Sequence, residues 1–247
     1  MKKQQNGHRS SQTVGFNVAT NLVLGVLVLS VGALCLAPME DAVKTEGENV
    51  QLYRSAGENA VGVSLMFNVY WGTEEVYRIL DILKTHDMKA TFFIGGCWAD
   101  DNVDCLRDIA AAGHELGNHG YFHKDHDKLD LTNNRKEIAE TNRFIELSTG
   151  IKPTLFAPPS GAYNADTLTA ANMLGMKTIL WSRDTIDWRD KNASLIYTRA
   201  TKDIKNGDFI LMHPMAATAD ALDDILKFYE NHSLTAVTVS ENLQKEG

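Results

Sequence analysis

The sequence predicts an α/β domain in which a parallel sheet closes as a barrel. Over residues 61–239, short apolar runs alternate with amphipathic segments, as expected when parallel strands are joined by crossover helices. Neither a dinucleotide-type glycine pattern nor a phosphate-loop lysine follows the first apolar run, which disfavours a nucleotide-binding doubly wound sheet. A barrel is therefore favoured, and no nucleotide is expected as a ligand.

Hydrophobic periodicity predicts each element of this barrel. Buried strands are expected at residues 61–67, 90–94, 154–157, 177–181, 208–213 and 235–239, and a short one directly before His119. Amphipathic helices are expected at residues 74–83, 103–112, 132–148, 166–174, 194–205 and 222–229. Gly113, Gly150 and Gly175 each follow one of these helices, which fits a left-handed C-cap.

The N-terminal segment predicts a single-pass membrane anchor. Residues 1–37 contain three basic residues, no acidic one, and an apolar run over 18–37 that is long enough to span a bilayer. We therefore expect a cytoplasmic tail at 1–17, a transmembrane helix at 18–37, a solvated stem at 38–58 and an extracytoplasmic domain at 59–247. A cleaved signal peptide, which would make the protein secreted, is the alternative, although Pro38 disfavours cleavage.

The charge of the chain excludes nucleic acid as a partner. The 247 residues carry a formal net charge of -8, and because the first 37 residues carry +3, the remainder carries -11. A domain of this charge has no electrostatic attraction to nucleic acid or to anionic surfaces.

Two cysteines lie in the expected domain, Cys97 and Cys105. In an oxidising compartment such a pair can close as a disulfide between a loop and the start of a helix. Two free thiols are the alternative, and the sequence leaves both open.

Polar residues follow several of the predicted strands. His119 and His123 stand four positions apart, a spacing suited to metal ligation, but a catalytic site typically combines three protein ligands with an open position. Other strand ends carry Asn68, residues 158–160, residues 184–188 and His213. Taken singly, each could be a solvated loop group or a half-buried histidine. In a barrel, however, all would converge on the rim at the carboxyl ends of the strands.

These motifs resemble those of the NodB-type polysaccharide deacetylases, carbohydrate esterase family 4, over residues 61–243. The segment His119-Gly-Tyr-Phe-His123 matches the second motif of the family, Asp187-Trp188 the fourth, and Leu211-Met-His213 the fifth. The resemblance implies a distorted (β/α)7 barrel that removes acetyl groups from chitin, xylan or peptidoglycan glycan with a divalent metal, for which zinc is expected.

The resemblance also implies a role for individual residues. His119 and His123 would be metal ligands, Asp187 would tune the catalytic His213, and His213 would protonate the leaving amine. Substrate contacts would come from four residues of the fourth, fifth and third motifs: Trp188, Leu211, Pro159 and Ser160.

Two motifs depart from the family pattern. Where the first motif normally reads T-F-D-D-G, this chain has Met66-Phe67-Asn68-Val69, so the family base is replaced by Asn68 and the third metal ligand by Val69. The arginine of the third motif is replaced by Ala157, which leaves no unpaired cation beside the uncharged Asn68. Both changes resemble a divergent, membrane-anchored branch of spore-forming bacteria whose first motif runs F-[ND]-[IV]-x-W-G.

Two functions follow as expectations. The first is a metal-dependent hydrolase of carbon–nitrogen bonds other than peptide bonds, which deacetylates cell-wall glycan outside the cytoplasm. Because an amide has no usable basicity, this enzyme would need another base: His213, Asp184, or one of Glu74 and Glu75. The second is a catalytically impaired member that binds or scaffolds glycan. An unrelated hydrolytic activity on the same barrel rests on fold alone.

Overall fold

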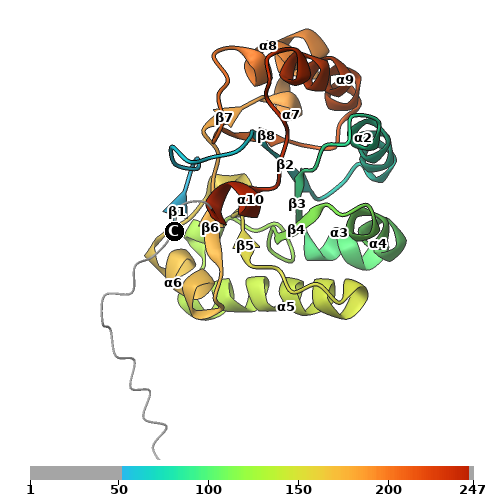
Figure 1. The fold of residues 1–247 in the computed structure, drawn as a ribbon. Coiled ribbons are helices and arrows are strands. Elements are labelled where there is room, and N and C mark those ends of the chain that lie inside the picture. Colours follow the sequence, from blue (N-terminus) through green and yellow to red (C-terminus); the bar gives the residue numbers. More distant parts are fainter. Residues whose placement is uncertain (1–51, 245–247) are drawn as a thin grey trace, which may run out of the picture. The chain divides into compact units, whose positions relative to one another are not determined.

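The computed structural model describes residues 52–244 (Figure 1). The predicted tail at 1–17, the predicted transmembrane helix at 18–37 and most of the stem lie outside this range. Within residues 52–244, no helix is both long enough and apolar enough to cross a membrane.

The domain is built on one parallel sheet of eight strands in the order β1-β6-β5-β4-β3-β2-β8-β7. In chain order these are β1 (Leu52–Tyr53), β2 (Ser64–Val69), β3 (Thr91–Ile94), β4 (Glu115–Asn118), β5 (Leu155–Phe156), β6 (Lys177–Ile179), β7 (Arg183–Asp184) and β8 (Phe209–Met212). Strand β1 pairs with β6, and Ser55 forms an isolated antiparallel bridge with Asp208, so residues 52–55 of the predicted stem contact the domain.

The sheet curls without a closing ladder. Strands β6 and β7 are separated in the chain only by residues 180–182, yet they lie near opposite ends of the strand order. At this link Leu180 N donates to Tyr53 O and Ser182 N donates to Phe209 O, so the chain itself joins the two ends. The expected parallel α/β sheet is confirmed, but among the described strands it forms a curled half-barrel rather than a hydrogen-bonded (β/α)7 barrel.

Helices surround the sheet, and the larger ones cover its outer face (Figure 1). They are α2 (Thr73–Thr85), α3 (Gly96–Asp101), α4 (Val103–Ala111), α5 (Leu131–Thr149), α6 (Ala165–Met173), α7 (Asp187–Asp190), α8 (Ala193–Thr201), α9 (Ala216–Asn231) and α10 (Val239–Leu243), with 3-10 turns at His126–Lys128 and Pro159–Gly161. The pairs α5 with α6 and α8 with α9 lie at opposite ends of the domain.

Strand alternation divides the core into two layers. On β2, Leu65, Phe67 and Val69 pack outward against the helices in the larger apolar cluster. Met66 points inward and packs with Phe93 and other residues of the curled sheet's interior. Because successive strand residues face opposite sides, Asn68 shares the inner face with Met66. This alternation decides which groups of the first motif can reach a site inside the barrel.

One predicted strand is wrong. Residues 235–239 contribute an isolated parallel bridge between Ala236 and Val63, after which α10 begins at Val239. Thr238 and Glu241 form a reciprocal capping box that starts this helix. Helix α10 lies at the amino ends of the strands, where Val239 N donates to Thr91 Oγ1. It closes the inner core at the end opposite the carboxyl ends of the strands.

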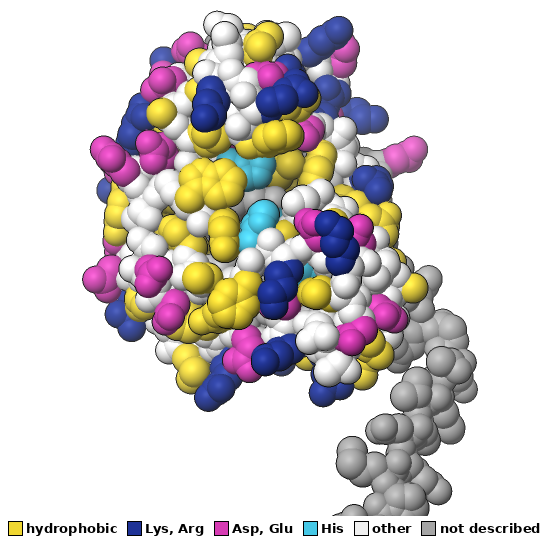
Figure 2. Space-filling model, turned by 180° about the vertical axis from the view of Figure 1, so that it is seen from behind, with side chains coloured by type: hydrophobic (Ala, Val, Ile, Leu, Met, Phe, Trp, Pro, Cys, Tyr) yellow, Lys and Arg dark blue, Asp and Glu magenta, His cyan; other side chains and the backbone are white. Residues whose placement is uncertain are grey.

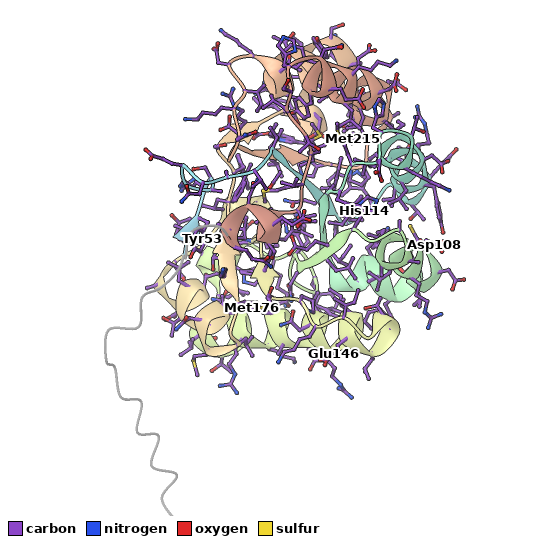
Figure 3. All side chains as sticks on the ribbon, viewed as in Figure 1. Tyr53, Asp108, His114, Glu146, Met176 and Met215 are labelled. Atoms are coloured by element: carbon purple, nitrogen blue, oxygen red, sulfur yellow. The ribbon has the colours of Figure 1, made fainter. Side chains whose placement is uncertain are left out.

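The two cysteines of the domain do not form a disulfide, and the buried His114 has a packing role. Cys97 and Cys105 are both free thiols. His114, labelled in Figure 3, is buried before β4, and its Nδ1 accepts from Ala90 N at 3.3 Å. Burial lowers the pKa of His114 to about 4, so this imidazole is neutral and serves the packing of β3 against β4.

Candidate active site

A pocket of about 330 Å³ opens at the carboxyl ends of the strands. Figure 2 shows histidine side chains in a hollow bordered by hydrophobic side chains. Most of the residues singled out from sequence at the strand ends line this pocket, and they are joined by two tryptophans that the site prediction did not include. The lining consists of Asn68, Trp71, His119, His123, Ser160, Trp181, Asp184, Trp188, Leu211 and His213.

Asn68 is an orphaned polar group at this pocket. Its side chain is 3% exposed, and its Oδ1 has no hydrogen-bond partner among the described residues. A buried carbonyl oxygen without a partner loses hydration with no compensation, which is uncommon in folded proteins. Such an atom is a candidate ligand for a bound group.

Val69 does not line the pocket. It is fully buried in the outer apolar cluster, on the face of β2 that packs against the helices. The motif comparison expected the third metal ligand at this position, but the strand directs the side chain away from the histidines. Of the two substituted first-motif positions, only Asn68 reaches the site.

His119 is held as a neutral imidazole. Its Nδ1 donates to Ala157 O at 2.7 Å, which leaves the lone pair on Nε2. Complete burial lowers the pKa of His119 well below its usual value, with the neighbouring His123 adding to the effect. A neutral histidine whose other nitrogen is fixed by a carbonyl is the form in which imidazole ligates metals.

His123 lies beside His119, with ring centroids 5.1 Å apart. It has a left-handed backbone, with φ 51, and burial lowers the pKa of this histidine as well. The sharp turn between the two histidines passes through Gly120, at φ 72, where a Cβ would stand 2.9 Å from His126 Nε2. This close approach explains why glycine stands where the family usually has serine or threonine.

Glu137 of α5 ties down the loop that carries His123. Its Oε2 accepts from Tyr121 N at 3.0 Å and Phe122 N at 2.8 Å, while its Oε1 pairs with Lys124 at 2.7 Å. Charge-assisted bonds from a buried carboxylate to backbone N–H groups are strong and directional. Sequence reasoning missed Glu137 because nothing in the pattern of α5 distinguishes it from a solvated helix residue.

Asp187 and His213 form a close pair on the other side of the pocket. Asp187 Oδ1 accepts from His213 Nδ1 at 2.8 Å, and Oδ2 accepts from His213 N at 2.6 Å. Asp187 also accepts from Trp188 N and from Thr218 Oγ1, so this fully buried carboxylate has four donors. The pair fixes the ring of His213 with Nδ1 engaged, which leaves Nε2 as the nitrogen that can exchange a proton with a ligand.

The expected substrate contacts divide into two groups. Trp188, Leu211 and Ser160 line the pocket, whereas Pro159 is buried and is not among the lining residues. Pro159 packs under the histidine turn, since a Cβ on Gly120 would lie 3.4 Å from its Cγ. Its place is therefore structural support for the loop.

The candidate replacement bases also divide. Asp184 lines the pocket, with its Oδ1 accepting from Ile186 N at 2.7 Å. Neither Glu74 nor Glu75 is among the lining residues. Of the proposed replacement carboxylates, Asp184 is therefore the one that lines the pocket.

The residues at the pocket form at most an incomplete donor set for a divalent metal. Within residues 52–244, no cluster of three or more histidine, cysteine, aspartate or glutamate side chains is placed to hold an ion. His119, His123 and Asn68 line the same pocket, so two neutral imidazoles and an amide oxygen could together hold a divalent metal there. This set lacks an anionic ligand, so its affinity is expected to fall below that of a carboxylate-containing site.

Comparison with known proteins agrees with this geometry. The family model described as polysaccharide deacetylase matches residues 57–179. This chain belongs to the polysaccharide deacetylase family. The uncharacterized protein YlxY of Bacillus subtilis is 40% identical over 179 residues, which cover 72% of this chain and 56% of YlxY. The peptidoglycan-N-acetylmuramic acid deacetylase PdaC of Bacillus subtilis is 34% identical over 165 residues, which cover 66% of this chain and 35% of PdaC.

Among solved structures of the family, BA3943 from Bacillus anthracis is described as a carbohydrate esterase family 4 pseudoenzyme. It superposes with a TM-score of 0.77 at 35% identity, over 80% of this chain and 70% of BA3943. A BA3943 mutant with restored enzymatic activity superposes with the same TM-score. The chain therefore spans about half of YlxY and about a third of PdaC, but most of the BA3943 structure.

Proposed function

We propose that this protein is an extracytoplasmic member of the polysaccharide deacetylase family that binds N-acetylated cell-wall glycan and has lost efficient turnover. The observation that carries the proposal is Asn68, an uncharged side chain at the pocket position of the family base. Loss of a general base commonly lowers a rate by about 10² to 10⁴. Similarity to a protein described as a pseudoenzyme supports the same proposal.

The proton-donating half of the site is complete. Asp187 holds Nδ1 of His213, so Nε2 is oriented to give a proton to a leaving nitrogen. Trp188 and Leu211 provide apolar walls against which an acetyl methyl group can lie. His119, His123 and Asn68 would hold a divalent metal, which when bound would polarise the acetyl carbonyl. What the described pocket lacks at position 68 is a group that can accept a proton from water.

The test compares binding with turnover on the same sample. The protein is titrated with tetra-N-acetylchitotetraose and with soluble peptidoglycan fragments by calorimetry, and acetate is assayed with zinc, cobalt or manganese added. We expect saturable binding of at least one glycan and acetate release no faster than that of a His119→Ala variant. Acetate release well above that variant would contradict loss of turnover, and no binding of either glycan would contradict the glycan ligand.

Slow deacetylation is a second candidate, favoured by one observation. Asp184 lines the pocket together with the intact Asp187 and His213 pair, so a carboxylate is present near the expected substrate. If Asp184 accepts the proton from water, wild type should release acetate and Asp184→Asn should abolish release while glycan binding is retained. Equal acetate release by both proteins would exclude Asp184 as the base.

The location outside the cytoplasm is proposed from residues 18–37 alone. A single-pass anchor there would place the glycan pocket at the cell surface. Membrane fractionation with protease treatment of intact cells tests it: the domain should sediment with membranes and be digested from outside. Recovery in the soluble cell fraction would refute the anchor.

A further inference from the structure

The loop between β2 and α2 carries an exposed tryptophan, Trp71. It belongs neither to the Asp187 and His213 pair nor to the His119 and His123 pair. Trp71 is 40% exposed and lines the pocket. Large aromatic side chains are ordinarily highly buried, and an exposed one in a pocket commonly marks a binding surface. The position of this ring is set by the residues around it.

Gly72 holds the loop after β2 against the loop that begins with His213 directly after β8. It has a left-handed backbone, with φ 77, and a Cβ added there would stand 2.1 Å from Pro214 O. This contact with backbone leaves no room for a side chain, so the loop after β2 lies directly on the loop after β8. Trp71, which precedes this glycine, is thereby brought over His213.

The indole of Trp71 stacks on the imidazole of His213. Their ring centroids are 5.6 Å apart and their planes differ by 5°. Tyr70 packs edge-on to Trp71 at 6.5 Å and also lies against His123 at 4.6 Å. Offset stacking and edge-to-face contacts are the favoured aromatic geometries. One face of the indole is therefore supported by protein, and the ring is held in one orientation before any ligand arrives.

A second exposed tryptophan comes after the other strand that neighbours β8. Trp188 is 50% exposed, lines the same pocket and follows β7. In the sheet, β8 lies between β2 and β7, and His213 directly follows β8, while Trp71 lies in the loop after β2 and Trp188 in α7, which follows β7. Both indoles line the same pocket, and they come from segments that follow the two strands on either side of β8.

This arrangement suits the apolar faces of a sugar. A pyranose ring exposes C–H groups on its faces and hydroxyl groups around its edge, so aromatic rings can contact its faces while polar groups contact the edge. We infer that Trp71 is a sugar-stacking residue that works together with Trp188 and grips an N-acetylhexosamine unit of the glycan over His213. The inference rests on the proposed glycan binding and names a contact for it.

The experiment measures the affinity of the full chain for tetra-N-acetylchitotetraose by calorimetry. The variants are Trp71→Ala, Trp71→Phe and the matched control Tyr77→Ala, because Tyr77 is also 40% exposed but does not line the pocket. Loss of a stacking contact should weaken binding by Trp71→Ala about tenfold. Trp71→Phe, which keeps an aromatic face, should recover affinity to within about threefold of wild type, and Tyr77→Ala should bind like wild type.

Two outcomes overturn the inference in distinguishable ways. If wild type binds and Trp71→Ala binds equally well, Trp71 is only a cover for His213, and the glycan-binding function stands without it. If wild type does not bind the tetrasaccharide, the proposed function fails for this ligand and the inference fails with it. Should the alanine variant unfold, Trp71→Phe keeps the test decisive, since a phenylalanine variant that binds more than about threefold more weakly than wild type would also refute stacking.

Discussion

The replacement of Asn68 by aspartate tests whether one position separates this pocket from a competent metal site. Asn68→Asp keeps the shape of the side chain and gives up no hydrogen bond of Oδ1, because that atom has no partner among the described residues. It places an anionic oxygen at the pocket lined by His119 and His123. A site of two histidines and one carboxylate is a donor set that binds zinc in catalytic proteins.

The size of the effect follows from linkage between binding and folding. At a free metal concentration 100 times the dissociation constant, binding stabilises the native state by about 2.7 kcal/mol. For a domain of this size each kcal/mol raises the melting temperature by about 2–4 °C, so zinc should raise that of Asn68→Asp by about 5–10 °C. Thermal unfolding with and without zinc measures this shift, and acetate assays show whether turnover returns.

Val69→Asp is the contrasting variant. Motif alignment alone would treat both positions alike, but Val69 is fully buried among apolar side chains on the outer face of β2. A carboxylate there loses the burial of valine and is left unpaired, which should destabilise the fold by more than about 4 kcal/mol. The reasoning is refuted if zinc leaves the melting temperature of Asn68→Asp unchanged, or if Val69→Asp folds stably and gains metal binding by itself.

Three further predictions concern the support of the site and of the fold. Asp187→Ala leaves four donors without an acceptor, including two of His213, and should lower the free energy of unfolding by about 3–5 kcal/mol in urea titrations. Glu137→Ala frees two backbone N–H groups of the histidine loop, and their hydrogen exchange should accelerate, while unaltered exchange would show that Glu137 does not hold the loop. Burial lowers the pKa of His86, but hydrogen bonds to Asp223 and a second carboxylate raise it above 6.5. The stability contributed by His86 should therefore be fully present below pH 6.5 and be lost as the pH rises through the raised pKa, a dependence that Asp223→Asn should reduce.

Most elements could be predicted because their signals are local. The four apolar residues at helical spacing in α2, from Val76 to Leu83, are the ones the structure buries. The strand predicted at residues 235–239 was wrong because a short apolar run fits a strand and a buried loop equally well. Its capping box at Thr238 and Glu241 was a local signal for α10 that the apolar run obscured. Strands β1 and β7 have two residues each, too few for periodicity to register.

The structure bears on where the predicted site residues lie, while their chemical roles stay predictions. His119, His123, Trp188, Leu211 and His213 were placed at one rim, and the structure gathers them in one pocket. Trp71 and Glu137 were missed as site residues, because their roles depend on contacts with loops and strands distant in sequence.

By itself the sequence determined the parallel α/β class and the strand ends that carry polar groups, since hydrophobic periodicity and residue chemistry are local properties, and its resemblance to the family implied the loss of an acid at position 68. Only the tertiary structure decided that the sheet curls without closing, that Asn68 faces the histidines while Val69 faces the core, and that Trp71 lies on His213. The first two features depend on strand register. The third depends on Gly72, whose lack of a side chain lets its loop pack against Pro214. Contacts between segments far apart in the chain leave no periodic signal in either segment.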